Sequence, residues 1–246
     1  MTEQKNSYIF IRSLMIAFFA YAWLSVNVYL PALPELPRVF HTTPAALKLS
    51  VTLFFSGYAL SQLFWGPLSE KHGRRKAILY GMCITTVGVV IAMTAMRVWV
   101  FNAGRLIEAL GLGCASVLGR AILVDLLDKM QMFKTMSYAT LVVNVMPAIA
   151  PIIGGALLLW AGWRSIFAML LFFSVVLLLL FIFRLMETNL RIRKEIKPKE
   201  MILDYLMVVR NSRYVAFVLL YVLGTGAMIG YYTMAPYIFI QSLHLS

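Results

Sequence analysis

The chain has 246 residues, 61% of them hydrophobic and 13% charged, with a net charge of +12 and a mean hydropathy of +0.83. This composition excludes a water-soluble protein with a surface of mixed charge, and it indicates an all-α polytopic membrane protein. The basic excess has two explanations, nucleic-acid binding or cations gathered in loops on one side of a membrane, and the positions of the cations decide between them.

Seven apolar segments are long enough to cross a bilayer, which requires about 20 residues for a hydrocarbon core of roughly 30 Å. They are residues 13–33, 46–65, 77–96, 98–124, 136–160, 165–186 and 214–232. The first six predict a six-helix bundle over residues 1–186. A polar linker at 187–213 then leads to a seventh helix within 214–246.

The cations are distributed unevenly between the two sides of these spans. With the N-terminus in the cytoplasm, the cytoplasmic segments carry 17 Lys and Arg, Arg120 among them, and the other side carries four. This asymmetry predicts that orientation and argues against nucleic-acid binding. In the linker, Ile202, Tyr205, Leu206 and Val209 recur at helical spacing, which predicts a short helix that lies on the membrane surface or in solvent.

Several polar and aromatic side chains lie within the predicted spans. An amide facing lipid would be unsatisfied, so Asn27 is expected to face the bundle interior. Aromatic rings with sparse amides suit a cavity for a small amphipathic ligand, although they serve equally as contacts between helices. The candidate cavity residues are Trp23, Asn27, Tyr58, Gln62 and Asn144.

Arg105 and Glu108 are ionisable residues deep in the fourth span, three residues apart and hence on one helix face. They form either a structural ion pair or a titratable carboxylate in a water-filled cavity. Gly111, Ala115 and Gly119 continue along nearly the same face, so a neighbouring helix is expected to approach closely there. The three histidines lie outside the spans without ligand spacing, so no metal site is expected.

The fifth span contains Pro147 and Pro151, which each remove a backbone hydrogen bond, and Gly154 and Gly155, which remove side-chain bulk on the next turn. This pattern predicts a kinked helix with an adaptable face. The kink serves either packing or a moving interface.

The loop after the second span, "GPLSEKHGRRK", resembles the loop signature of the major facilitator superfamily. "RLIEALGLGCA" resembles that superfamily's signature in the fourth helix. "NVYLPALP", "SQLFWGPLSE", "APIIGG" followed by "GWRSIF", the "ET" that opens the linker and "APYIFI" after the seventh span are together similar to the bicyclomycin/chloramphenicol-resistance (Bcr/CflA) branch of drug:proton antiporters.

The resemblance implies the N-terminal six-helix bundle of a secondary active transporter in a bacterial inner membrane. It implies export of a small amphipathic molecule against proton entry by alternating access, with the proton gradient as energy source and no cofactor. Arg105 matches an arginine linked to proton transfer, and Pro151, Gly154 and Gly155 match the antiporter signature. The same resemblance assigns gating roles to Gly66, which is expected to end the second helix, and to Glu70, Gly73, Arg74, Arg75 and Asp125. Within this group Asp125 is expected to pair with Arg74 or Arg75, and Glu70 to contact a second bundle.

Three features depart from the family pattern. Asn27 replaces the usual acid of the first helix, and Glu108 replaces a glutamine, which suggests the hypothesis that Glu108 has taken over proton binding. Only one bundle and one further helix are encoded, so a partner is expected in a missing C-terminal six-helix half. Alternatives are a metabolite facilitator or symporter, or an inactive remnant or interaction protein. The sequence shows no catalytic nucleophile, set of metal ligands or phosphate-binding loop, so an enzyme is not expected.

Overall fold

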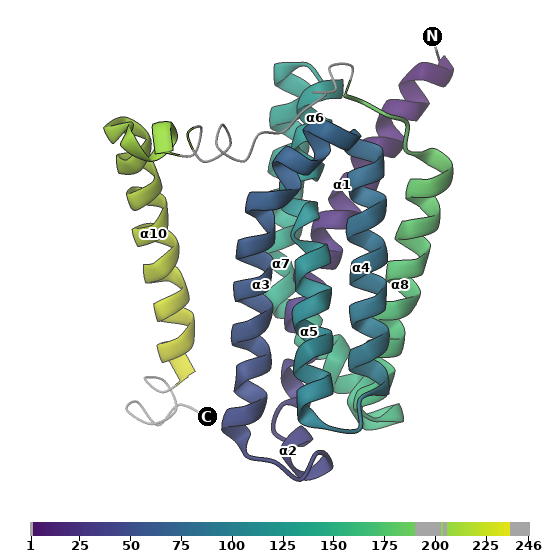
Figure 1. The fold of residues 1–246 in the computed structure, drawn as a ribbon, viewed down its shortest axis with the longest axis vertical. Coiled ribbons are helices and arrows are strands. Elements are labelled where there is room, and N and C mark those ends of the chain that lie inside the picture. Colours follow the sequence, from purple (N-terminus) through teal and green to yellow (C-terminus); the bar gives the residue numbers. More distant parts are fainter. Residues whose placement is uncertain (1, 190–202, 204–205, 237–246) are drawn as a thin grey trace. The chain divides into compact units, whose positions relative to one another are not determined.

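The computed structural model describes residues 2–189, 203 and 206–236. These residues contain helices and no strand, which confirms the all-α prediction (Figure 1). The chain divides into two compact units, Met1–Lys194 and Glu195–Ser246. In the first unit the elements are α1 (Thr2–Asn27), the 3₁₀ turn η1 (Leu30–Ala32), α2 (Leu36–Val39), α3 (Pro44–His72), α4 (Arg74–Thr94), α5 (Val98–Leu112), α6 (Cys114–Leu126), α7 (Lys129–Ala161) and α8 (Trp163–Arg184).

Five helical segments among the described residues are long and apolar enough to span a membrane: Ile9–Ala32, Arg74–Thr94, Val98–Leu126, Lys129–Ala161 and Trp163–Arg184. They correspond to five of the seven predicted spans. The predicted span 46–65 lies in α3, a helix of 29 residues. This helix is not one of the five, because its Ser, Thr, Tyr and Gln side chains and Lys48 lower its hydropathy.

The predicted helix 13–33 ends earlier than expected. Helix α1 stops at Asn27, and the chain continues through η1 and the short α2. Pro31 and Pro34 cause this, because a proline has no N–H to donate and is tolerated only in the first turn of a helix. Pro31 occupies such a first-turn position in η1.

The predicted helix 98–124 is interrupted at Gly113, which separates α5 from α6. Helix α3 crosses at this point so closely that a Cβ on Gly113 would lie 2.9 Å from the carbonyl oxygen of Tyr58 and still nearer to the hydroxyl of Ser61. Only a residue without a side chain fits there, and glycine weakens the helix that contains it. Local sequence pattern could not reveal this interruption.

Helices α4 and α5 pack backbone to backbone through glycines. A Cβ on Gly88 of α4 would lie 2.2 Å from the amide nitrogen of Glu108, and one on Gly111 of α5 would lie 2.4 Å from the carbonyl oxygen of Gly81. Small residues allow such an approach between membrane helices. Helix α4 also packs against α8, and α1 packs against α6, α7 and α8.

Gly111 and Gly119 do not face one common helix, contrary to the sequence prediction. Gly111 lies against α4, whereas a Cβ on Gly119 would lie 2.8 Å from the ring of Phe19 in α1. Eight residues at 3.6 per turn leave a rotation of about 80° between the two positions. That rotation is enough to direct them at different neighbours.

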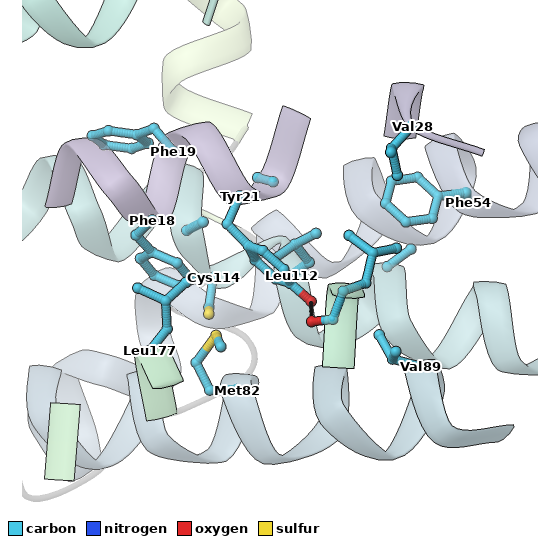
Figure 2. Packing of buried hydrophobic residues seen from close by; sticks show 14 of the residues in the cluster. Phe18, Phe19, Tyr21, Val28, Phe54, Met82, Val89, Leu112, Cys114 and Leu177 are labelled. Atoms are coloured by element: carbon cyan, nitrogen blue, oxygen red, sulfur yellow. Dashed lines mark hydrogen bonds between the residues drawn. The ribbon is translucent and has the colours of Figure 1, made fainter. Parts of the chain in front are cut away.

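Aromatic and aliphatic side chains from distant helices fill the centre of the first unit. Figure 2 shows Phe18 of α1 near Met82 of α4, Cys114 of α6 and Leu177 of α8, all of them buried. The Phe18 ring packs edge-on against the ring of Phe181, with centroids 5.0 Å apart. These contacts therefore join α1, the first helix of the unit, to α8, its last long helix.

The second unit contains α10 (Ser212–Pro236). Asn211 caps this helix, because its Oδ1 accepts hydrogen bonds from the backbone N–H groups of Arg213 (3.1 Å) and Tyr214 (3.3 Å). Of the residues that predict the linker helix, Leu206 and Val209 lie within residues 206–210, which are helical. Ile202 and Tyr205 lie outside the described residues, so the start of this helix stays a prediction.

Candidate functional site

Arg105 and Glu108 form an ion pair inside the first unit. Arg105 Nη1 lies 2.6 Å from Glu108 Oε2, and both side chains are 0% exposed. The helical spacing places both on one face of α5, as predicted. Burying two charges is favourable only when their remaining hydrogen-bonding atoms find partners, so the surroundings decide the behaviour of the pair.

Ser25 of α1 supplies some of those partners from another helix, whereas the buried Arg105 Nε has no hydrogen-bond partner among the described residues. Its hydroxyl donates to Glu108 Oε1 and lies 3.4 Å from Arg105 Nη1. Its backbone carbonyl accepts from Arg105 Nη2 at 3.2 Å. The ion pair therefore connects α5 to α1.

Aromatic rings surround the Arg105 guanidinium on its other sides. Its Cζ lies 4.2 Å from the ring centroid of Tyr29, 4.3 Å from that of Phe54 and 5.8 Å from that of Phe167. A cation over an aromatic face at this range is attracted by the ring quadrupole. The rings thus stabilise the arginine charge independently of Glu108.

The candidate cavity residues are dispersed. Trp23 is 38% exposed, Gln62 is half-buried, and the Tyr58 hydroxyl is hydrogen-bonded to that of Ser116 in α6. Asn144 is exposed on α7, where it lines an open hollow of about 630 Å³ formed with Phe133, Met136, Ser137, Thr140, Leu141 and Val145. None of the other four candidates lines that hollow.

Asn27 was expected to face the bundle interior, but its amide finds a hydrogen-bond partner in its own helix. It is half-buried, and its Nδ2 donates to the carbonyl oxygen of Trp23 at 2.8 Å, within its own helix. Because that bond satisfies the amide locally, the need for a polar partner does not force Asn27 into the bundle interior.

A second polar cluster lies where α3, α4, α6 and the start of the linker meet. Arg74 Nε is 3.4 Å from Asp125 Oδ2, and its Nη1 donates to the hydroxyl of Ser69. Asp125 Oδ2 also accepts from the Thr188 hydroxyl at 3.2 Å. Arg75 bonds instead to the carbonyl oxygen of Ile182, with 2.7 Å between Nη2 and O. Of the two expected partners for Asp125, the structure therefore pairs Arg74.

Glu187 holds the start of α4. Its carboxylate accepts from the backbone N–H groups of Arg74 (2.7 Å, Oε1) and Arg75 (3.2 Å, Oε2), where the positive end of the helix dipole favours an anion. Gly73 precedes them with φ +91°, and a Cβ there would lie 2.2 Å from Glu187 Oε2. A glycine is thus required both for the turn and for the approach of this carboxylate.

Gly66 does not end the second predicted helix. Helix α3 continues through Gly66 and Pro67 to His72, with Glu70 half-buried in its last turns. The Ser69 hydroxyl donates to the Gly66 carbonyl oxygen at 2.7 Å. This side-chain hydrogen bond gives a partner to the carbonyl group that precedes Pro67. Gly73 is the residue at which the helix stops.

Helix α7 is continuous over 33 residues, with Pro147 and Pro151 inside it. Pro147 is exposed, Pro151 is half-buried, and Gly154 lies against the end of α1, where a Cβ would fall 1.7 Å from the carbonyl oxygen of Val28. An added Cβ on Gly155 meets no atom within 4 Å. The two glycines therefore differ, and only Gly154 is needed for a close helix contact.

Sequence reasoning missed Ser25, Tyr29, Phe54 and Glu187 as site residues. A buried charge pair requires further partners, but no sequence pattern indicates which helix supplies them. For Glu187 a signal was available, since the "ET" at the start of the linker was part of the family resemblance.

Comparison with known proteins supports this resemblance. The family described as Major Facilitator Superfamily matches residues 14–246. The chain is 32% identical over 189 residues to a bicyclomycin resistance protein homolog of Haemophilus influenzae, over 77% of this chain and 47% of that protein. It is 29% identical over 171 residues to multidrug resistance protein D of Escherichia coli, over 70% and 43% of the two chains. The chain thus spans about half the length of the curated relatives it matches.

Solved structures show the same fold at low identity. A peptide transporter POT in complex with sulfate aligns with a TM-score of 0.63 at 14% identity, over 90% of this chain and 47% of that one. The human organic anion transporter MFSD10 aligns with a TM-score of 0.60 at 18% identity, over 82% and 53%.

These findings confirm the predicted family. The five apolar helices agree with a multi-pass membrane protein. With the family match covering nearly the whole sequence, the chain belongs to the Major Facilitator Superfamily.

Proposed function

We propose that this chain acts in proton-coupled export of small amphipathic molecules by alternating access, in a bacterial inner membrane with its N-terminus in the cytoplasm. The proton gradient supplies the energy, without a cofactor, and a second six-helix half completes the transport path. The names of the relatives, a bicyclomycin resistance protein homolog and a multidrug resistance protein, support export of drug-like molecules. The charge asymmetry supports the orientation.

One observation carries the coupling proposal, the fully buried Arg105–Glu108 pair bonded to Ser25. Burial opposes the charge on Glu108, whereas the guanidinium and the serine hydroxyl favour it. These opposing effects suit a carboxyl group that exchanges a proton during transport. The aromatic rings over Arg105 retain its charge when Glu108 is neutral.

Protonation would change how α1 is held. The carboxylate accepts from both Arg105 and Ser25, whereas a protonated carboxyl group donates through one oxygen and no longer forms an ion pair. Because Ser25 belongs to α1 and Glu108 to α5, the proton alters a contact between two helices. This gives proton binding a direct structural consequence within the bundle.

Infrared spectroscopy of the purified full chain in lipid nanodiscs tests this proposal. We expect the C=O band of a protonated carboxyl group in wild type to titrate with pH and to be absent from Glu108→Gln. The matched control Glu35→Gln removes an exposed acid outside the spans and should keep the band. If the Glu108 band does not respond to pH, a facilitator without proton coupling is the better assignment.

Bicyclomycin susceptibility tests export in cells that express the chain together with the C-terminal half of the Haemophilus influenzae relative. We expect wild type and Glu35→Gln to raise the inhibitory concentration and Glu108→Gln to abolish the increase. Equal resistance from all three variants would refute the role of Glu108. No resistance from wild type in the presence of that second half would refute export by this chain.

A further inference from the structure

Arg120 lies inside a membrane span, and not in a cytoplasmic loop as predicted from the distribution of cations. The segment Val98–Leu126 has 29 residues, and the 20 or so residues at its middle, which cross the hydrocarbon core, run from about 102 to about 122. The Cα–Cβ bonds of a helix tilt toward its N-terminus. The Cα–Cβ bond of Arg120 therefore points toward the middle of the span, and away from Asp125 and the loop end of the bundle.

The side chain projects between α1 and α3. On one side of Arg120, Val117 faces α3, where its side chain would lie 3.7 Å from a Cβ on Gly66. On the other side, Gly119 touches the Phe19 ring of α1. At about 100° per residue, position 120 lies in the arc between these two contacts. Arg120 is exposed there, while Leu118 and Gly119 beside it are buried.

Other polar groups lie on the same face. Ser116 precedes Arg120 by one turn and is hydrogen-bonded to the Tyr58 hydroxyl of α3. Gln62 lies one turn beyond Tyr58 on α3 and is half-buried. The cation is thus accompanied by hydroxyl and amide groups that could bind a polar ligand.

Arg120 takes part in neither of the ion pairs found among the described side chains. The two ion pairs found there are Arg74–Asp125 and Arg105–Glu108. Glu108 is 0% exposed, and Asp125 is bound by Arg74 and Thr188. An exposed cation within a span is costly in lipid, so it is expected to face water or a ligand.

From these observations we propose that Arg120 determines charge specificity, favouring small amphipathic substrates that carry an anionic group, such as a carboxylate or sulfonate, over cationic ones. This inference rests on the proposed function as a small-molecule carrier and specifies its substrate class. A guanidinium presents several N–H donors in a plane that matches such oxygen pairs.

Two probes with the same ring system test this specificity: 8-anilino-1-naphthalenesulfonate, which is anionic, and N-phenyl-1-naphthylamine, which is neutral. Fluorescence titration uses the full chain in phosphatidylcholine nanodiscs, with empty nanodiscs subtracted. For Arg120→Ala we expect the Kd of the sulfonate to rise about tenfold, as for one partly solvated ion pair, and that of the neutral probe to stay within about twofold. Arg120→Lys should retain most of the sulfonate affinity.

Arg97→Ala is the control, since it removes an exposed arginine next to the start of α5. It should leave both Kd values unchanged. An equal loss of both probes in Arg120→Ala, or an equal loss of the sulfonate in Arg97→Ala, would overturn the specificity proposal. If the neutral probe binds and the sulfonate is insensitive to Arg120, this proposal alone fails. If neither probe binds wild type above empty nanodiscs, the small-molecule function fails with it.

Discussion

Replacing one member of the Arg105–Glu108 pair should destabilise the bundle more than replacing both. The perturbations are Arg105→Met, Glu108→Met and the double variant. Either single change leaves one ionisable group in a site where both side chains are 0% exposed. The double change leaves apolar side chains of suitable length on α5 and removes both charges.

The magnitudes follow from the loss of a buried partner. Breaking a buried pair from one side costs about 3–5 kcal/mol, whereas replacing both members is often close to neutral. Here the double variant also leaves Ser25 without its two partners, so we expect it to cost about 1–2 kcal/mol. Glu108→Met should be the more damaging single change, because a lone guanidinium cannot lose its charge and a lone carboxyl group can.

Thermal unfolding of the purified variants, followed by tryptophan fluorescence at one heating rate, checks this order. At about 2–4 °C per kcal/mol for a chain of this size, each single variant should lower Tm by about 6–20 °C. The double variant should recover a large part of that loss. If the two single effects simply add in the double variant, the side chains are not energetically coupled and the ion pair does not organise this site.

Further predictions concern the loop, the helix contacts and Ser25. Gly73→Ala should lower Tm by several degrees, because it strains a φ of +91° and collides with Glu187; Glu187→Ala in the same chain should relieve only the collision. Gly88→Leu should prevent α4 from packing on α5, whereas Gly155→Ala, which meets no atom within 4 Å, should keep or slightly raise Tm. Thermal melts followed by circular dichroism measure the Tm of these four variants. Ser25→Ala should cost about 1–3 kcal/mol, because a buried carboxylate oxygen loses its donor, and should shift the carboxyl infrared band.

The presence of helices could be predicted from apolar length, but their ends could not. A run of about 20 apolar residues has to be helical in a bilayer, since no water is available to its backbone groups. The interruption at Gly113 depends on Ser61 of α3, about fifty residues away in sequence. The end of α1 depends on Pro31 and Pro34, and the helix stops at Asn27, one turn before the first of them.

The charge pair could be predicted in part. A spacing of three residues is enough to place Arg105 and Glu108 on one helix face. The direction of that face depends on the glycine contacts between α4 and α5, which bring Glu108 against Gly88. Ser25 and Tyr29 enter the site only because α1 packs nearby, and apolar patterning does not set the rotation of one helix against another.

Helix α1 contacts both halves of the interrupted helix α5–α6. Through Ser25 it is bonded to the Arg105–Glu108 pair of α5, and through Phe19 it lies against Gly119 of α6, six residues before Asp125. Gly113 separates these two contacts, and α5 is also tied to α4 by close backbone packing. A change in the charge of Glu108 should therefore alter the Ser25 contact first, because side-chain hydrogen bonds join α1 and α5 there. The interface of α5 with α4 should change less, because it is formed by backbone packing. Since α1 also lies against α6, its displacement would reach the helix that carries Arg120 and Asp125 without any rearrangement of α5 on α4.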